Sequence, residues 1–155
     1  MEIFDFAALD FAPFILSFKL AGLTTLILFV LSLPLAWYLS QTSSKTKPFL
    51  EAVTALPIVL PPSVLGFYIL VVLSPNSAVG GFFEDLFGVK LVFSFAGLVV
   101  ASCFYSLPFM VQPLQSGFES LNKHMLEASY LAGKSKLQTV LKIALPNIKP
   151  SLITA

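Results

Sequence analysis

Few residues of this 155-residue chain could carry out covalent or metal chemistry. Cys103 and His124 are each the single residue of their type, so the chain offers no Cys/His metal cluster and no internal disulfide. Cys103 also lies in an apolar stretch, where a free cysteine behaves as a small buried hydrophobic residue. No set of carboxylates, or of nucleophile and base, of the kind that enzymes use lies in or beside the apolar stretches. We therefore expect no catalytic residue, no metal site and no enzymatic activity.

One segment resembles a nucleotide-binding loop superficially. Residues 128–135 read ASYLAGKS, which fits a loosened phosphate-loop pattern with Ala128 in place of the first glycine. Such a loop needs a preceding strand and small residues, because successive backbone N–H groups must surround the phosphates. Here Tyr130 and Leu131 occupy the loop, and an amphipathic helix is expected before it. We therefore predict that this chain binds no nucleotide and holds no cofactor of its own.

The composition indicates a membrane protein. Hydrophobic residues make up 57% of the chain and charged residues 11%, whereas a soluble domain has about 25% charged residues. Three windows, 20–44, 52–83 and 91–118, contain no charged residue, and each exceeds the roughly 20 residues that a helix needs to cross a bilayer. Their polar residues do not follow the helical period that a soluble bundle would show. The net charge of +1 does not indicate the strongly basic surface that nucleic-acid-binding proteins carry.

We expect an all-α fold, a polytopic bundle of transmembrane helices. Span one is predicted at 13–40, span two at 49–73 and span three at 92–111, with a turn-rich loop at 74–90. Pro34 is expected to kink span one, and Trp37 and Tyr38 suit the interfacial aromatic belt. Residues 1–12 form an acidic and aromatic tail, which differs from the basic start of a cleaved signal peptide.

The lysines predict the orientation of these spans. All nine basic residues are lysine, and seven of them lie within 41–48 or 116–150. Because cytoplasmic loops carry an excess of Lys and Arg, we expect both segments in the cytoplasm. The N-terminus and the 74–90 loop would then face outward.

Residues 119–146 are amphipathic, unlike the rest of the chain. Apolar residues at helical spacing indicate two short helices. The first stripe holds Leu121, Met125, Ala128 and Ala132, and the second holds Leu137, Val140, Leu141 and Ala144. Gly133 lies between them, where a helix can end at a residue of positive φ, and Leu145 and Pro146 would lead into the next membrane helix. Helices this short need a partner surface, although a linker resting on lipid phosphates fits the periodicity equally well.

This segment resembles the EAA loop of ABC importer permeases, E-A-A-x3-G-x9-I-x-L-P. Every spacing is kept, with serine in place of the second alanine. The residues that carry the resemblance are Glu127, Ala128, Ser129, Gly133, Ile143, Leu145 and Pro146. The resemblance implies a coupling loop that docks on a cytoplasmic ABC ATPase subunit, a separate polypeptide that binds the ATP.

Prolines mark the middle of the chain as irregular. Pro57, Pro61 and Pro62 remove backbone donors, which lipid tolerates only where the freed carbonyls face protein or a water-filled cavity. Span two is therefore either a kinked structural helix or an irregular wall of a translocation pathway. The candidates for that pathway are Pro57, Pro61, Pro62, Ser63, Gly66, Ser102, Ser106 and Gln112. The polar members among them are equally the kind of residue that packs helices together.

A narrower resemblance covers about residues 14–155. Residues 56–66 match L-P-x-V-L-P-P-x-V-x-G and residues 93–111 match F-x-x-x-G-x-V-x-A-x-x-x-x-S-x-P-x-x-V, two stretches shared by molybdate ABC transporter permeases. Sulfate/thiosulfate and tungstate permeases are close relatives of that family. The resemblance implies a permease domain at 13–155 that is incomplete at its C-terminus.

The resemblance also implies a bacterial or archaeal plasma (inner) membrane protein that acts as a homodimer in an ATP-driven importer. An extracytoplasmic binding protein would deliver the oxyanion, most simply molybdate, with sulfate, thiosulfate, tungstate or another solute as alternatives. A non-transport membrane scaffold, whose amphipathic segment rests on lipid, is the alternative of a different class.

Overall fold

The computed structural model describes residues 11–155, so the predicted tail at 1–12 lies almost wholly outside the described residues. The described part is mainly helical and contains no strand, which confirms the predicted all-α class. In chain order the helices are α1 (Ala12–Gln41), α2 (Lys47–Val59), α3 (Pro62–Leu73), α4 (Ala78–Phe87), α5 (Phe95–Glu119), α6 (Lys123–Leu131), α7 (Lys136–Thr139), the π-helix η2 (Val140–Ala144), α8 (Leu145–Asn147) and α9 (Lys149–Thr154).

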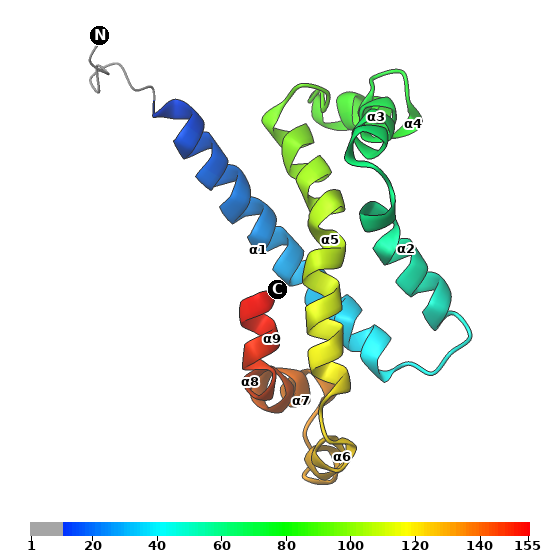
Figure 1. The fold of residues 1–155 in the computed structure, drawn as a ribbon, viewed down its shortest axis with the longest axis vertical. Helices are drawn as coiled ribbons and strands as arrows, with labels where there is room; N and C mark the ends of the chain where they lie inside the picture. Colours follow the sequence, from blue (N-terminus) through cyan, green and yellow to red (C-terminus); the bar gives the residue numbers. More distant parts are fainter. Residues whose placement is uncertain (1–10) are drawn as a thin grey trace.

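Helices α1 and α5 cross each other and form the centre of the fold (Figure 1). They contain 30 and 25 residues, and both are long and apolar enough to cross a membrane. The buried core lies between them and the start of α8 and α9; it consists of Leu28, Ala36, Leu39, Met110, Val111, Leu114, Phe118, Ala144 and Ile148. Trp37, predicted at the membrane interface, packs edge-to-face on Phe118 with ring centroids 5.1 Å apart, while Tyr38 is exposed. The predicted bounds of span one are confirmed to within a residue.

Span two was predicted as either a kinked or an irregular helix, and it is broken into two helices. Helices α2 and α3 meet at an angle of 110°, so the pair is at most a broken span. The break follows from the two consecutive prolines, Pro61 and Pro62, because the residue before a proline is disfavoured in the helical region. Leu60 is accordingly extended, with ψ of 136°. Pro57 is buried inside α2 without ending that helix.

The prediction of a loop at 74–90 is wrong, since α4 occupies most of it. The Ser77 side chain caps this helix by accepting a hydrogen bond of 2.9 Å from the Gly80 N–H. Gly88 ends it in the left-handed region, with φ of 65°. These are ordinary start and stop signals, but the turn-forming residues of this stretch indicated a loop. Helix α4 lies beside α3 at the same end of α5 (Figure 1).

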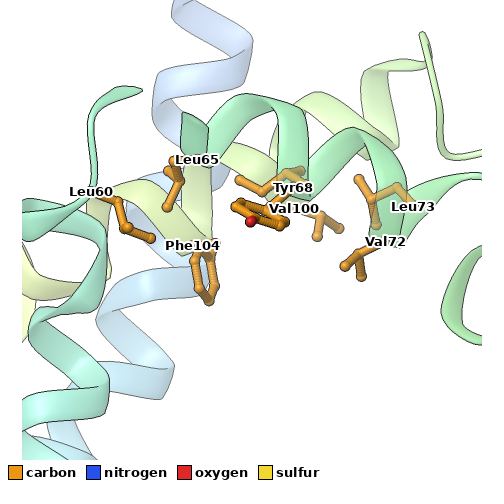
Figure 2. A pocket seen from close by; sticks show the side chains of 8 residues that line it. Leu60, Leu65, Tyr68, Val72, Leu73, Val100 and Phe104 are labelled. Carbon is orange, nitrogen blue, oxygen red and sulfur yellow. The ribbon is translucent and has the colours of Figure 1, made fainter. Parts of the chain in front are cut away.

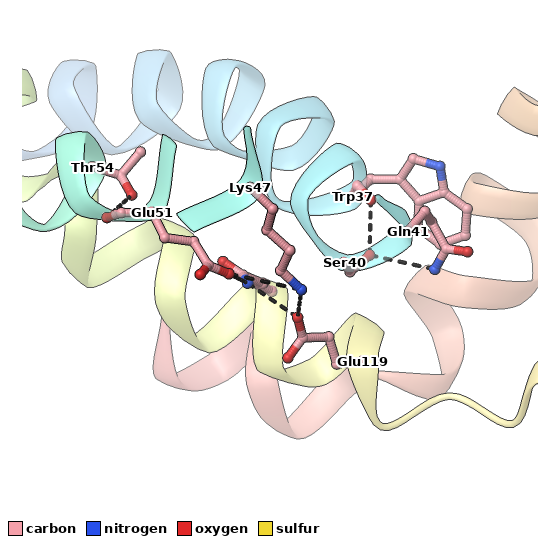
Figure 3. Close-up of polar contacts among 8 residues, drawn as sticks. Trp37, Ser40, Gln41, Lys47, Glu51, Thr54 and Glu119 are labelled. Atoms are coloured by element: carbon pink, nitrogen blue, oxygen red, sulfur yellow. Dashed lines mark hydrogen bonds and ion pairs between the residues drawn. The ribbon is translucent and has the colours of Figure 1, made fainter. Parts of the chain in front are cut away.

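Helix α5 is longer than predicted and reaches Glu119 rather than residue 111. Its last turns approach the start of α2, where Lys47, Glu51, Gln115 and Glu119 form a polar cluster (Figure 3). The Lys47 ammonium lies 2.8 Å from a Glu119 carboxylate oxygen and 3.7 Å from Glu51. The Gln115 amide donates to Glu51 at 2.6 Å and to Glu119 at 3.1 Å. Glu51 is therefore part of this cluster.

Reversing the charge of Lys47 is expected to destabilise this end of the fold. Lys47→Glu would place three carboxylates together, whereas Lys47→Glu combined with Glu119→Lys keeps one cation between two acids. We expect the single variant to lower the midpoint of thermal unfolding in detergent and the double variant to recover most of the loss. Lys45→Glu is the matched control, because Lys45 has no carboxylate partner among residues 11–155. An equal loss in Lys45→Glu would contradict the role of the cluster.

Candidate functional site

Helices α6 and α7 form a short hairpin at the end of α5 opposite α4 (Figure 1). The Asn122 side chain caps α6 by accepting from the His124 N–H at 2.9 Å. At the other end Gly133 has φ of 74°, which confirms the predicted glycine hinge. The Gly133 N–H donates to the Tyr130 carbonyl at 3.0 Å, and the next N–H donates to the Ser129 carbonyl at 3.2 Å. This pair of bonds is the Schellman arrangement that ends a helix at a left-handed residue.

The hairpin continues immediately into α7 through a reciprocal cap. The Ser135 hydroxyl accepts from the Gln138 N–H, and the Gln138 side chain accepts from the Ser135 N–H. Such a capping box satisfies two backbone donors that a helix start leaves open. Backbone bonds therefore fix both sides of the turn, so the hairpin has a defined shape despite its short helices.

One side-chain contact joins the two helices. The Ser129 and Thr139 hydroxyls lie 2.8 Å apart, and both residues are buried. Ser129 is the residue that replaces the second alanine of the EAA pattern. The sequence did not indicate Thr139, because the predicted stripes consist of apolar residues and Thr139 is polar. Its partner Ser129 also lies ten residues away, on the other side of the hinge. This bond sets how α6 and α7 meet.

Leu145 and Pro146 were predicted to lead into the next membrane helix, and the chain does continue as helix through both residues. Helical turns continue to Asn147, and they pass through the π-helix η2. Pro146 has no N–H to donate, and its ring crowds the carbonyl four residues earlier, which a wider turn relieves. The Leu145 N–H accordingly donates to the Val140 carbonyl, and the Asn147 side chain donates to the Ile143 carbonyl at 2.7 Å.

The hairpin is attached to the membrane helices through its C-terminal part. Ala144 and Ile148 are fully or almost fully buried, and they belong to the same core cluster as Leu114 and Phe118 of α5. Ile143 and Leu145 of the EAA pattern are half-buried beside them, and Pro146 is exposed. A displacement of the hairpin would therefore press directly on α1 and α5, because close-packed interiors transmit strain.

The other side of the hairpin carries apolar side chains that no described residue covers. Leu131 is 89% exposed and Leu137 is 68% exposed, and Leu141 is exposed as well. Glu127 and Ala128 are also exposed, so Ala128, Leu137 and Leu141 of the predicted apolar stripes are uncovered in this chain. Exposed leucines gathered on a short segment are typical of a protein-binding surface. We call Glu127, Ala128, Leu131, Leu137 and Leu141 the exposed hairpin residues.

The structure brings only some pathway candidates together. Ser102 and Ser106 line a groove of about 490 Å³ between α1 and α5, together with Ser17, Thr24 and Thr25. The sequence reading missed these last three hydroxyls, and Thr24 is the most notable. Its hydroxyl is buried and has no hydrogen-bond partner within residues 11–155. The groove therefore offers hydroxyl groups and no charge.

The remaining candidates lie elsewhere. Pro61, Pro62 and Ser63 are exposed at the α2–α3 break, and Gly66 is half-buried on α3. Gln112 is exposed on α5 outside the hydroxyl-lined groove. No described groove unites these residues with Ser102 and Ser106.

A second cavity, of about 260 Å³, lies between α3 and α5 (Figure 2). Its wall consists of Leu60, Leu65, Tyr68, Ile69, Val72, Leu73, Val100 and Phe104. Such an apolar wall cannot replace the hydration shell of an anion, so this cavity is not a binding site for an oxyanion.

Comparisons with known proteins agree with this architecture. A family model described as "Binding-protein-dependent transport system inner membrane component" matches residues 22–155. The molybdenum transport system permease protein ModB of Azotobacter vinelandii is 46% identical, over 94% of this chain and 65% of its own length. The putative molybdenum transport system permease protein YvgM of Bacillus subtilis is 31% identical over 93% and 63%.

A probable sulfate transport system permease protein, cysT of Chlorella vulgaris, is 30% identical over 92% of this chain and 53% of its own length. The chain thus spans about half to two thirds of the length of these curated relatives. All three are transport permeases rather than enzymes, in accordance with the sequence reading. The chain belongs to the family of binding-protein-dependent transport system inner membrane components.

Proposed function

We propose that this chain is part of a permease subunit of an ATP-driven importer. The subunit carries an oxyanion across the membrane, and molybdate is the first candidate. The 46% identity to a molybdenum transport permease supports molybdate over other cargoes. A sulfate permease is the second candidate, because a sulfate relative is 30% identical over nearly the same residues. Uptake of labelled molybdate in competition with sulfate distinguishes the two cargoes.

The pathway is formed by two copies of the full subunit. The hydroxyl-lined groove at Thr24, Ser102 and Ser106 supports a passage that binds its cargo weakly, because it contains no Lys or Arg to hold a dianion. Selection of the oxyanion then belongs to a separate extracytoplasmic binding protein. Membership of a binding-protein-dependent family supports such a partner.

The hairpin couples the permease to a cytoplasmic ATPase subunit, which binds the ATP. The observation that carries this proposal is the division of the hairpin into two sides. The exposed hairpin residues offer a docking surface, while Ala144 and Ile148 are packed against α5. Closure of the ATPase on ATP would move the hairpin, and the shared core would pass that movement to α1 and α5. The lysine distribution supports a cytoplasmic position of the hairpin and of residues 41–48.

Glu127→Lys tests the docking proposal. Glu127 is exposed on α6, and its only described side-chain partner is the exposed His124 at 3.3 Å, so the substitution leaves the permease fold intact. Reversing a charge at the rim of an interface weakens association, and we expect about five- to tenfold less ATPase subunit in a pull-down and a similar loss of uptake.

Asp85→Lys on α4 is the matched control, because it reverses an exposed acid at the opposite end of α5. It should leave the amount of bound ATPase unchanged. Normal ATPase binding in Glu127→Lys, or labelling of Lys134 and Lys136 from outside the cell, would refute the docking proposal.

A further inference from the structure

Another groove, of about 460 Å³, lies where α1, α4 and the start of α5 meet. Its wall includes Leu23 of α1, Phe83 and Phe87 of α4, and Phe95, Ala96 and Val99 of α5. All of these side chains are hydrocarbon. Because α1 and α5 are long and apolar enough to cross a membrane, the hydrocarbon of a bilayer is a surface that such a groove can meet.

Two lysines lie near this groove, because Lys90 stands between Val89 and Leu91 of its wall, but the lysine that contacts a wall side chain is Lys19. The Lys19 ammonium is 5.3 Å from the centroid of the Phe95 ring, which is part of the groove wall. Lys19 precedes Leu23 by four residues, so both lie on the same side of α1. Lys19 has no carboxylate partner among residues 11–155, whereas Lys90, the other lysine at this end, lies 3.6 Å from Glu84.

The depth of Lys19 in the membrane matches the level of lipid phosphates. Helix α1 has 30 residues, so it is about 45 Å long, and the hydrocarbon core it crosses is about 30 Å thick. If α1 is centred, about 7 Å at each end lies outside the hydrocarbon. Lys19 is about 10 Å from the start of α1, near that boundary, and Leu23 lies about 6 Å deeper. The cation is thus at the polar boundary and the groove at the level of acyl chains.

We propose that this groove binds one acyl chain of an anionic phospholipid, with the lipid phosphate beside the Lys19 ammonium. A lysine in a membrane helix is costly unless an anion accompanies it, and the bilayer supplies phosphate at this depth. A transmembrane helix laid in the groove would have to bring its own carboxylate to do the same. The proposal does not depend on which solute the permease carries.

Lipid retention measured by native mass spectrometry tests the charge. The full permease, purified with its partner subunits, is equilibrated with equal amounts of phosphatidylglycerol and phosphatidylethanolamine. Both lipids carry a phosphate, but only phosphatidylglycerol has a net negative charge, and one lysine near that charge corresponds to about a fivefold preference for the anionic lipid. We expect Lys19→Gln to lose this preference, Lys19→Arg to keep it and Lys90→Gln to leave it unchanged. A preference that persists in Lys19→Gln, or that Lys90→Gln removes equally, would overturn the assignment.

A second pair of variants tests the groove. Ala96 is exposed and lines the groove, so Ala96→Trp should fill it and release both lipids, without regard to headgroup charge. Leu98→Trp is the control, because Leu98 is exposed on the same helix outside the groove. Unchanged lipid retention in Ala96→Trp would argue against the site. So would a disulfide cross-link between two copies of a Leu23→Cys permease, because it would assign the groove to a second copy of this chain.

Discussion

Replacing Gly133 with valine is expected to reduce solute uptake by about tenfold or more, while the subunit still inserts into the membrane. Gly133 has φ of 74° and ends α6 in the Schellman arrangement. No atom lies within 4 Å of the position that a Cβ would take, so the cost arises from backbone conformation and not from lack of space. A left-handed conformation costs an L-residue about 1–2 kcal/mol, and a β-branched residue more. The turn would therefore rearrange, and α7 would leave the position in which it is held against α6.

Two variants separate backbone conformation from side-chain size. Gly133→Asn should retain most of the uptake, because asparagine tolerates positive φ. Ala132→Val places the same β-branched side chain on an exposed neighbour whose φ is −76°, and it should have little effect. Uptake by membrane vesicles and the amount of co-purified ATPase subunit are the measurements. Full activity of Gly133→Val in a well-expressed subunit would show that the shape of the turn is unimportant.

Features with a local cause could be predicted from the sequence. Helix α1 was placed to within a residue because a charge-free window, a proline at its start and a polar loop at its end all coincide. The conformation of Gly133 was predicted because a glycine between two apolar stripes is an ordinary helix end. Both signals depend on neighbours within a few residues.

The directions of helices could not be predicted in the same way. Pro61 and Pro62 indicate that the helix breaks, but the 110° angle depends on what α3 packs against. Helix α4 had a clear cap at Ser77 and a clear end at Gly88. These signals were outweighed by the turn-forming residues of 74–90, which indicate a loop as readily as the ends of a short helix.

Within the hairpin, the EAA pattern identified the segment but not its buried side. Helical spacing placed Ala128 and Leu137 on apolar stripes, and both are exposed in this chain. The buried side instead includes Ser129 and Thr139, two polar residues that satisfy each other. A hydrophobic pattern cannot reveal such a pair, because its members are counted as polar and therefore as exposed.

Ser129→Ala is the second substitution expected to have a large effect, and here the motif and the structure disagree. The motif has alanine at this position, so resemblance alone predicts no loss. In the structure the substitution leaves the Thr139 hydroxyl buried, 0% exposed, without its partner. An unsatisfied buried hydroxyl costs about 1–3 kcal/mol, which corresponds to a roughly five- to 150-fold decrease in the equilibrium constant for folding of the hairpin. We therefore expect a lower midpoint of unfolding, faster proteolysis of the hairpin and reduced uptake.

The double variant distinguishes a lost bond from lost volume. Thr139→Val alone should destabilise the hairpin for the same reason as Ser129→Ala. Combining the two replaces both hydroxyls by apolar groups, which is nearly neutral, so the double variant should be more stable than either single variant. Ser116→Ala, at an exposed serine of α5, controls for removal of a hydroxyl as such. Losses that simply add in the double variant would mean that the two hydroxyls act independently, and that the angle between α6 and α7 is set by the turn at Gly133 alone.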